Sequence, residues 1–454
     1  MPQSKSKDEA EHAHNEAFYA KKDWLLFASR FQPGFNGPQV FLSRQKRKSS
    51  TLEPILAINT ATCQTYPEFT RLRRRLLAAA KSVLLTPFQI MRIMAPRAKY
   101  AKNAFGRSYR GQYADIFRAW WYADLQPQEY YEALLARHQG GPALFEYFDA
   151  DLVFRVVAVL QLDLFGEPAL HLNDKALFGK WLAEEGLPGA AEFAVTSATS
   201  DIDPRQLLAL GKEIIIKPNR SGFGRRVEVW TRKSDDRWTT PERELSTANL
   251  IAHVKEQAQQ LIGGVVVQER LHNHSDLAAM TGKGLATCRF ITMRNENSDL
   301  EVVMFYWRMA WPGSNVDNYH AGGFYWITDD NETGVIVHGV DTDTQAKQRL
   351  LTHHPVTGAY MIGFTHPNFA ELRALALKAH EKLPDIMFAG WDVAMTTQGP
   401  KLIELNTPCS FPPRIQMTTD GLGQSRCGQI LAHYARTWLE LPIGSRTKPP
   451  RATL

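Results

Sequence analysis

Short apolar runs separated by polar turns fill the sequence from residue 190 onward, and this pattern predicts β-strands. The runs cover residues 191–195, 213–218, 225–230, 263–271, 286–294, 300–310, 322–330, 386–395 and 401–405. Helices are predicted where apolar residues recur three and four positions apart. These segments are 71–94, 113–137, 145–161, 173–188, 247–262, 369–383 and 423–441. Because strands and helices mix without strict alternation, we expect an α+β fold rather than a doubly wound parallel sheet.

Local signals fix some of the predicted helix ends. Asn173 or Asp174 is a suitable N-cap for the helix that ends near Gly186. The helical pattern over 113–137 is interrupted by a turn at Gln126–Pro127, and that over 71–94 by a break near Pro87.

The last two predicted strands form a hairpin across TTQGP, and they carry unexpected charges. If the chain turns about Gln398, Asp392 lies directly opposite Glu404, with Asn406 diagonal to both. Opposed carboxylates repel each other at roughly 5 Å. A divalent cation with oxygen ligands would relieve the repulsion, and magnesium would leave coordination positions open for phosphate. The hairpin therefore predicts a nucleotide site.

Lysines and glycines upstream suit phosphate binding. Lys217 ends an apolar strand, and Gly222 and Gly224 follow it in a loop that could bring backbone N–H groups close to a ligand. The loop lacks the Gly-Lys-Ser/Thr of a P-loop. Lys175 opens a predicted helix and is the weaker candidate: the first turn of a helix favours anions, and the alternative is a solvated lysine.

Other polar residues allow two interpretations each. Arg289 and Arg308 lie inside apolar strands, so each forms a salt bridge or binds an anion. Asn318, followed by paired glycines, indicates backbone close to a ligand or a plain turn. Gln268 and Glu269 end a hydrophobic strand and could bond an adenine edge. The spacing of His353, His354 and His366 matches no metal site, so these histidines are assigned to loops.

Charge divides the 454 residues unevenly. Residues 1–110 hold 20 Lys+Arg and 7 Asp+Glu, whereas the remainder holds 33 and 40. The basic region is interpreted as a solvated, partly disordered leader, with an anionic membrane surface as the alternative. No recognised nucleic-acid motif accompanies the charge, so we expect no nucleic-acid partner. Four scattered cysteines, and no apolar run that resembles a signal peptide or membrane span, favour the cytoplasm, with peripheral contact at the inner membrane face as an option.

The order of these motifs resembles the ATP-grasp superfamily, and within it the sugar-transfer-associated ATP-grasp proteins. The similarity rests on NDK before a helix ending in GLP, IIIKPNRSGFG, VVVQE, and Asp392 followed by Glu404-x-Asn406. LQPQEYYEALL, VDNYHAGG and HPVTG–YMIGFTHP add to it, and it covers about residues 110–440. The resemblance implies two α+β subdomains that grip ATP between antiparallel sheets, after a basic helical N-terminal region.

The family resemblance implies a role for each matching position. Lys175 and Lys217 would bind the nucleotide phosphates, and the loop residues Ser221, Gly222 and Gly224 would close over them. Gln268 and Glu269 would hold adenine and Asp276 the ribose. Arg289, Arg308 and Asn318 would lie near the γ-phosphate and the acyl phosphate. Asp392, Glu404 and Asn406 would hold two magnesium ions.

The implied function is an ATP- and Mg²⁺-dependent carboxylate–amine or carboxylate–thiol ligase, acting through an acyl phosphate on a sugar- or peptide-containing acceptor. A kinase-like phosphotransferase and a non-catalytic nucleotide-binding scaffold are the alternatives. The expected organisation places a basic region at 1–110, a helical segment at 111–170, a subdomain with the phosphate lysines at 171–270, a subdomain with the magnesium site at 271–440 and a tail at 441–454.

Overall fold

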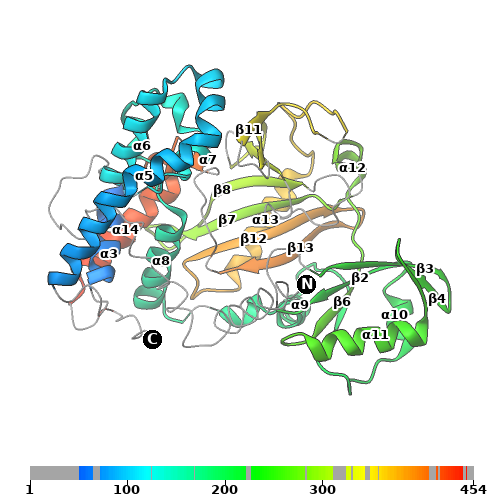
Figure 1. Cartoon of the computed structure of the whole chain (residues 1–454). Helices are drawn as coiled ribbons and strands as arrows, with labels where there is room; N and C mark the ends of the chain where they lie inside the picture. The colour runs from blue at the N-terminus through cyan, green and yellow to red at the C-terminus, as the bar shows by residue number, and fades with distance from the viewer. Residues whose placement is uncertain are drawn as a thin grey trace.

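The protein is described from a computed structural model that combines a helical part with two β-sheets (Figure 1). The described residues are 51–64, 72–123, 125–167, 169–220, 226–281, 284–309, 324–328, 331–342, 348–355, 357–407, 409, 416–417, 420–442 and 446. Both sheets are antiparallel throughout the strand pairs described. The expected α+β class is therefore confirmed.

The smaller sheet has the strand order β1-β6-β2-β3-β4-β5. Its strands are β1 (Glu192–Val195), β2 (Glu213–Pro218), β3 (Glu228–Ser234), β4 (Arg237–Thr239), β5 (Glu244–Ser246) and β6 (Val265–Glu269). Helices α10 (Pro204–Ala209) and α11 (Thr247–Gln260) cover one face. Ile214, Ile216, Trp230 and Val267 point to that covered face and are fully buried there.

The larger sheet has the order β11-β10-β9-β8-β7-β12-β13. Its strands are β7 (Thr287–Arg294), β8 (Leu300–Met309), β9 (Phe324–Thr328), β10 (Ile336–Thr342), β11 (Gln348–Leu351), β12 (Phe388–Thr396) and β13 (Gly399–Asn406). Helix α13 (Phe369–Glu381) packs on one face, where Phe290, Phe305 and Trp391 are buried. Helix α14 (Arg426–Glu440) packs against β7 and β8 on the other face.

The helical part lies beside the larger sheet (Figure 1). It contains α3 (Leu52–Gln64), α5 (Leu72–Phe105), α6 (Tyr109–Ala123), α7 (Glu129–Glu132), α8 (Ala150–Leu160) and α14, and α9 (Lys175–Glu184) leads from it to the smaller sheet. Short 3₁₀ turns span Leu135–His138, Pro142–Phe145, Leu170–Asn173 and Leu422–Gln424, and a π-helical turn spans Gln161–Phe165. Among the described helices, none combines the length and the apolar character that crossing a membrane requires.

Two sequence expectations about helices were wrong. The predicted break near Pro87 does not occur, because α5 continues through Pro87 and Pro96 to residue 105. Thr86 and Ile90 on either side of Pro87 are buried, so packing offsets the hydrogen bond that proline removes. The long helix expected after Pro127 is also shortened to α7 and a 3₁₀ turn, at which Leu134 has a φ of 51°.

The alternation of side chains along the strands places charged residues on the sheet faces opposite α11 and α13. In β2, Ile214 and Ile216 face α11, so Lys217 points to the other side of the smaller sheet. In β12, Trp391 and Val393 face α13, so Asp392 points to the side away from it. The sheet faces opposite α11 and α13 carry the candidate site residues, and α14 covers β7 and β8 on that side of the larger sheet.

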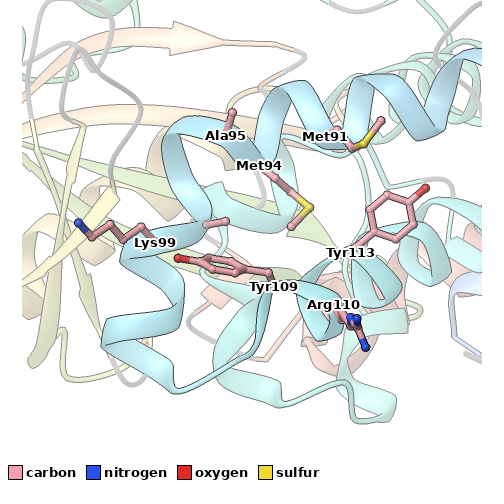
Figure 2. Close-up of a pocket in the computed structure, with 8 residues that line it drawn as sticks. Met91, Met94, Ala95, Lys99, Tyr109, Arg110 and Tyr113 are labelled. Carbon is pink, nitrogen blue, oxygen red and sulfur yellow. The ribbon is translucent and has the colours of Figure 1, made fainter.

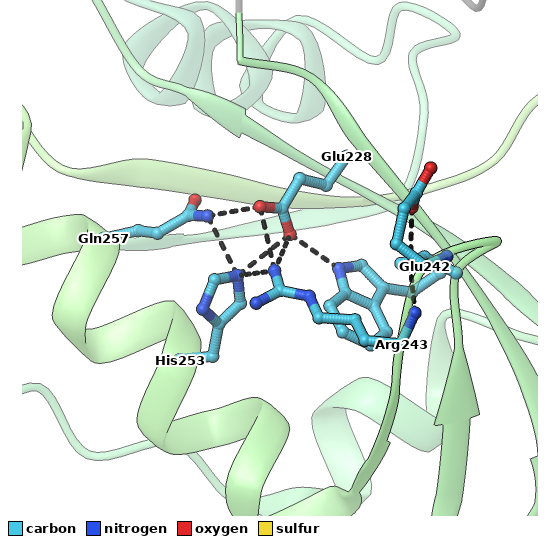
Figure 3. A network of polar contacts seen from close by, with 7 residues as sticks. Glu228, Glu242, Arg243, His253 and Gln257 are labelled. Atoms are coloured by element: carbon cyan, nitrogen blue, oxygen red, sulfur yellow. Dashed lines mark hydrogen bonds and ion pairs between the residues drawn. The ribbon is translucent and has the colours of Figure 1, made fainter. Parts of the chain in front are cut away.

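A polar network fixes β3, the strand that follows the glycine loop (Figure 3). The carboxylate of Glu228 accepts hydrogen bonds from Trp230 Nε1 at 2.8 Å, Gln257 Nε2 at 2.6 Å and Arg243 Nη2 at 3.1 Å. It also contacts His253 Nε2 at 2.9 Å. Burial alone would raise the pKa of Glu228, but the bonds to His253 and Trp230 outweigh it and lower that pKa. Glu228 thus ties β3 to α11.

Candidate functional site

Lys217 is the next-to-last residue of β2, and its side chain points to the face of the smaller sheet opposite α11. Its Nζ donates to Oε1 of Gln268 at 2.7 Å and lies 3.9 Å from Oε2 of Glu192. Burial lowers the pKa of Lys217, partly opposed by the charge of Glu192, and burial raises the pKa of Glu192 in turn. A lysine and an acid held this way in a partly desolvated place form a candidate binding site for a charged ligand.

Lys175 is the first residue of α9, where Asp174 is the N-cap. The Asp174 side chain accepts a hydrogen bond from the Leu177 N–H at 3.1 Å, so the capping prediction is confirmed. Lys175 is not simply solvated: its side chain is 15% exposed, and its Nζ lies 3.7 Å from Oε1 of Glu404. This ion pair connects the start of α9 to the far strand of the larger sheet.

Three residues that the sequence interpretation did not assign to the site hold these elements together. Asn173 Nδ2 donates to the Thr407 carbonyl at 3.2 Å, which ties α9 to the end of β13. Asn219 Nδ2 donates to Asp174 at 3.0 Å, while Asn219 Oδ1 accepts from the Ala176 N–H. Asp174 therefore has a second role, besides capping. In the sequence, the polar pair Asn173-Asp174 directly before Lys175 is the signal that could have indicated these contacts.

The hairpin has the predicted register at the residues that matter. Asp392 pairs with Glu404 and Gly390 with Asn406, and a bulge between Asp392 and Val393 shifts the pairing nearer the turn. The turn itself falls between Thr396 and Gly399, where Gly399 has a φ of 92° that other residues rarely adopt. Glu404 and Asn406 share one face of β13.

Asp392 is neutralised by two arginines rather than left to repel Glu404. Arg289 Nη2 donates to Oδ2 at 2.9 Å and its Nε to Oδ1, and Arg308 Nη1 donates to Oδ2 at 2.7 Å. Burial alone would raise the pKa of Asp392, but the two guanidinium charges outweigh it and hold that pKa below its usual range. A Cβ at Gly390 would come 2.7 Å from Sγ of Cys409 and 3.3 Å from Cδ of Arg289, so glycine there leaves room mainly for Cys409 and also for the arginine. Of the two interpretations of each arginine, the salt bridge is the one observed.

The oxygen donors still fit a magnesium ion. Glu404 has a side chain that is 34% exposed, and Asn406 follows it on the same face of β13. Carboxylate and amide oxygens are the ligands that Mg²⁺ prefers. Because both oxygens of Asp392 accept bonds from arginines, Glu404 and Asn406 are the freer ligands of the three.

The charges around these ligands leave a net positive environment. Lys175 pairs with Glu404, Lys217 with Glu192, and Arg289 and Arg308 with Asp392, which lies opposite Glu404 in the hairpin. This is four cations against three carboxylates, so the cluster would attract a polyanion such as a nucleotide triphosphate.

Glu269, the last residue of β6, uses its side chain for structural hydrogen bonds; the segment from Gln268 to Asp276 is called the hinge below. Glu269 Oε1 accepts from the Ala191 N–H at 2.7 Å, and its Oε2 accepts from Gln398 Nε2 at 3.1 Å. Gln268 points to Lys217. Both predicted adenine contacts therefore have other partners, and the backbone after β6 is the remaining candidate for bonding an adenine edge.

Asp276 lies next to two histidines at the start of α12 (Ser275–Thr281). Ligand atoms of His274, Asp276 and His366 lie within 4.8 Å of one another, and the two imidazole rings meet edge to face at 5.0 Å. His366 Nδ1 accepts from the Asn368 N–H at 3.0 Å, so the neutral ring carries its proton on Nε2. That buried Nε2 has no partner among the described residues. A donor beside a carboxylate suits ligand hydroxyls better than a cation, and sequence spacing alone did not reveal the cluster.

Four predicted site residues lie outside the described residues: Ser221, Gly222, Gly224 and Asn318. The remaining predicted residues fall into two groups. The first group meets around Lys217 and Asp392, and it contains Lys175, Lys217, Gln268, Arg289, Arg308, Asp392, Glu404 and Asn406. Glu269 and Asp276 form the second group, along the hinge.

The family profile described as sugar-transfer-associated ATP-grasp matches residues 166–425, more than half of the chain. The chain belongs to this ATP-grasp family. The match begins before α9 and ends at the N-cap of α14, so it contains both sheets and all the predicted site residues. The expected ATP-grasp fold is thereby confirmed.

Solved ATP-grasp structures resemble the chain at low identity. D-alanyl-alanine synthetase A of Vibrio cholerae has 15% identity and a TM-score of 0.36, covering 60% of this chain and 66% of the solved one. D-alanine–D-alanine ligase of Bacillus anthracis, complexed with ATP, has 12% identity and a TM-score of 0.33, covering 59% and 65%. The biotin carboxylase domain of the Hydrogenobacter thermophilus 2-oxoglutarate carboxylase has 13% identity and a TM-score of 0.34, covering 59% of this chain and 46% of the solved one. The chain thus spans 46% to 66% of the length of these proteins, and no curated protein matches it.

The candidate site residues of this ATP-grasp protein fall into parts that could have separate tasks. The lysines can neutralise phosphate charge, and Glu404 and Asn406 can hold a cation. The two arginines orient Asp392 and are not free to meet an anion while they do so.

Proposed function

We propose that the chain is an ATP- and Mg²⁺-dependent ligase that activates a carboxylate as an acyl phosphate and joins it to an amine or a thiol. The observation that carries the proposal is the pairing of Lys175 with Glu404 across the two parts of the site, beside Lys217 and the Asp392 ion pairs. A polyanion and a cation could be held there together.

In the proposed first step, a carboxylate oxygen of the donor attacks the γ-phosphorus of ATP. The bond from that phosphorus to the bridging oxygen breaks, and ADP leaves. Lys175 and Lys217 are assigned to the phosphate oxygens, where their charge offsets the negative charge that builds up. Magnesium, expected as two ions, would shield the phosphates when bound, and Glu404, Asn406 and Asp392 would hold it.

In the proposed second step, an amine or thiol attacks the acyl carbon, loses its proton, and displaces phosphate. The acceptor is expected to contain a sugar or a peptide-like group. Arg289 and Arg308 act as positioning residues, because they fix the carboxylate of Asp392 through three hydrogen bonds. Asn318 and the 221–224 loop keep their proposed roles near the acyl phosphate and over the phosphates.

The nucleoside end of ATP is assigned to the hinge. The backbone after Glu269 would bond the adenine edge. Asp276 would accept from a ribose hydroxyl, and His366 Nε2, a buried donor without a partner among the described residues, could donate to one. This arrangement supports a nucleotide over a bare phosphate as the ligand.

ADP release, screened with amino acids and amino sugars, tests the proposal. The Glu404→Ala variant should lose ADP release at least 100-fold, on the order of 3 kcal/mol of transition-state stabilisation. Glu184→Ala is the matched control, because Glu184 is exposed on α9 and its one ion-pair partner among the described residues is Lys180. Unchanged ADP release in Glu404→Ala would contradict the metal assignment.

Mass analysis of the product separates the possible reactions. An amide or thioester supports the ligase, and a phosphate ester of the acceptor would show a phosphotransferase instead. Binding of ATP without turnover on any substrate tested would favour a nucleotide-binding scaffold.

A further inference from the structure

The long helix α5 exposes an apolar stripe. Val83, Leu84, Leu85, Phe88 and Met91 have exposed fractions of 39%, 68%, 41%, 67% and 52%. Of the ten large hydrophobic side chains that are exposed among the described residues, these make up half, within nine positions of one helix. Single exposed apolar residues are ordinary, whereas a contiguous group marks a place of interaction.

Leu84, Leu85 and Phe88 lie on the side of the helix that points away from the protein, and Val83 and Met91 lie at the border with the packed side. Thr86, Ile90, Ala98 and Ala101 are buried, and α5 rests on α6 and the 3₁₀ turn at Leu135–His138 along this side. The exposed positions interleave with the buried ones at helical spacing. The stripe is therefore left over after the helix has packed, and it does not belong to the core.

A groove continues the stripe toward α6 (Figure 2). It has a volume of about 550 Å³, and Met91, Met94, Ala98, Tyr109 and Tyr113 form its apolar lining. Lys99 and Arg110 lie at its rim. Tyr109 is 46% exposed, and the Nζ of Lys102 lies 5.0 Å from the centre of its ring. Aromatic and basic side chains together are typical of a membrane interface.

The positive charge of α5 indicates which kind of surface binds this stripe. Its 34 residues contain eight Lys and Arg and no Asp or Glu. Arg92, Lys99 and Lys102 are exposed near the apolar stripe. A helix with an apolar side and an all-basic polar side binds in the plane of an anionic lipid surface.

We propose that the exposed side of α5, together with the groove it shares with α6, docks the protein on a membrane that contains anionic lipid. Leu84, Phe88 and Met91 enter the boundary between head groups and acyl chains. Arg92, Lys99 and Lys102 pair with lipid phosphates. The candidate nucleotide site lies on other elements, so docking and ligation are separable.

Sedimentation of the full chain with vesicles tests the proposal. We expect binding to vesicles of phosphatidylcholine mixed with phosphatidylglycerol, and weak binding to phosphatidylcholine alone. The double variant Leu84→Ser/Phe88→Ser should bind the mixed vesicles at least about tenfold less tightly. Its control is Leu350→Ser/Tyr360→Ser, which removes two exposed large hydrophobic side chains (44% and 60%) elsewhere on the surface and should bind as the wild type does.

A charge variant provides the second measurement. Arg92→Glu/Lys99→Glu should lose at least about tenfold in affinity for the mixed vesicles, and raised salt should weaken wild-type binding in the same way. Both α5 variants should keep the wild-type melting temperature and ATP turnover. Equal vesicle binding by the α5 variants and the control would overturn the proposal. So would a concentration-dependent dimer that the Leu84→Ser/Phe88→Ser change dissolves, with no vesicle binding by the wild type.

Discussion

The burial of the Asp392 carboxylate is explained by its ion pairs with Arg289 and Arg308. Sequence alternation correctly placed it opposite Glu404, because a short turn fixes the register of a hairpin. It also suggested that a cation must relieve the two charges. Arg289 and Arg308 come from β7 and β8, and which strands lie beside β12 is not encoded near Asp392. The neutralising partners therefore could not be predicted from the local pattern.

Replacing Asp392 by Asn should destabilise the fold strongly. The change leaves two buried guanidinium groups without a counter-charge, and the loss is expected at about 3–5 kcal/mol of the free energy of unfolding. Chemical denaturation measures it. Asp385→Asn, at an exposed aspartate close to the start of the same strand, is the control and should change little. A loss below about 1 kcal/mol would mean that the pair behaves like a surface salt bridge.

The same residue gives stability a pH dependence. The folded-state pKa of Asp392 is lowered, so its contribution is complete above the pKa of an unfolded aspartate, about 3.9. The contribution is lost as pH falls through the still lower folded pKa. The difference in unfolding free energy between wild type and Asp392→Asn should therefore be constant above about pH 5 and shrink below about pH 4. A difference that grows on acidification would contradict this assignment.

Elements were predicted well where one pattern decided them, and poorly where packing decided. The strands β2, β6, β7, β8 and β12 follow from apolar runs bounded by turn residues. The small strands β4 and β5 were missed, since three residues are too few for a periodic signal. Helix α5 runs through Pro87 because its buried side packs on the protein, which local propensity does not record.

The hydrogen bonds of Glu228 should stabilise strand β3 of the smaller sheet. Glu228→Ala removes hydrogen bonds from Trp230, Arg243 and Gln257, and we expect a loss of about 2 kcal/mol with faster amide exchange in β3. Glu242→Ala is the control, because its side chain is exposed and bonds Thr240 nearby. Equal exchange rates in the two variants would show that the network does not hold the strand.

At the scale of the whole molecule, the order of the motifs along the sequence correctly predicted the fold family. It did not reveal how the pieces meet. The contacts of Asn173 with Thr407 and of Lys175 with Glu404 join residues more than 200 positions apart. Nor did spacing connect His366 with Asp276, since the pairing depends on the packing of α12 against the loop before α13. Long-range contacts of this kind follow from topology rather than from periodicity.

A ligand that lies between the sheets should stabilise both of them at once. A non-hydrolysable ATP analogue with magnesium, at 100 times its dissociation constant, should add about 2.7 kcal/mol to the free energy of unfolding. Hydrogen exchange should slow in β2 and β6 and also in β12 and β13, because Lys217 and Glu404 would hold the same ligand from opposite sides. Lys217→Met should abolish the protection in both sheets, whereas Leu84→Ser/Phe88→Ser should leave it intact. Protection confined to the smaller sheet would place the nucleotide there alone, and the hairpin of Asp392 and Glu404 would then have no part in binding it.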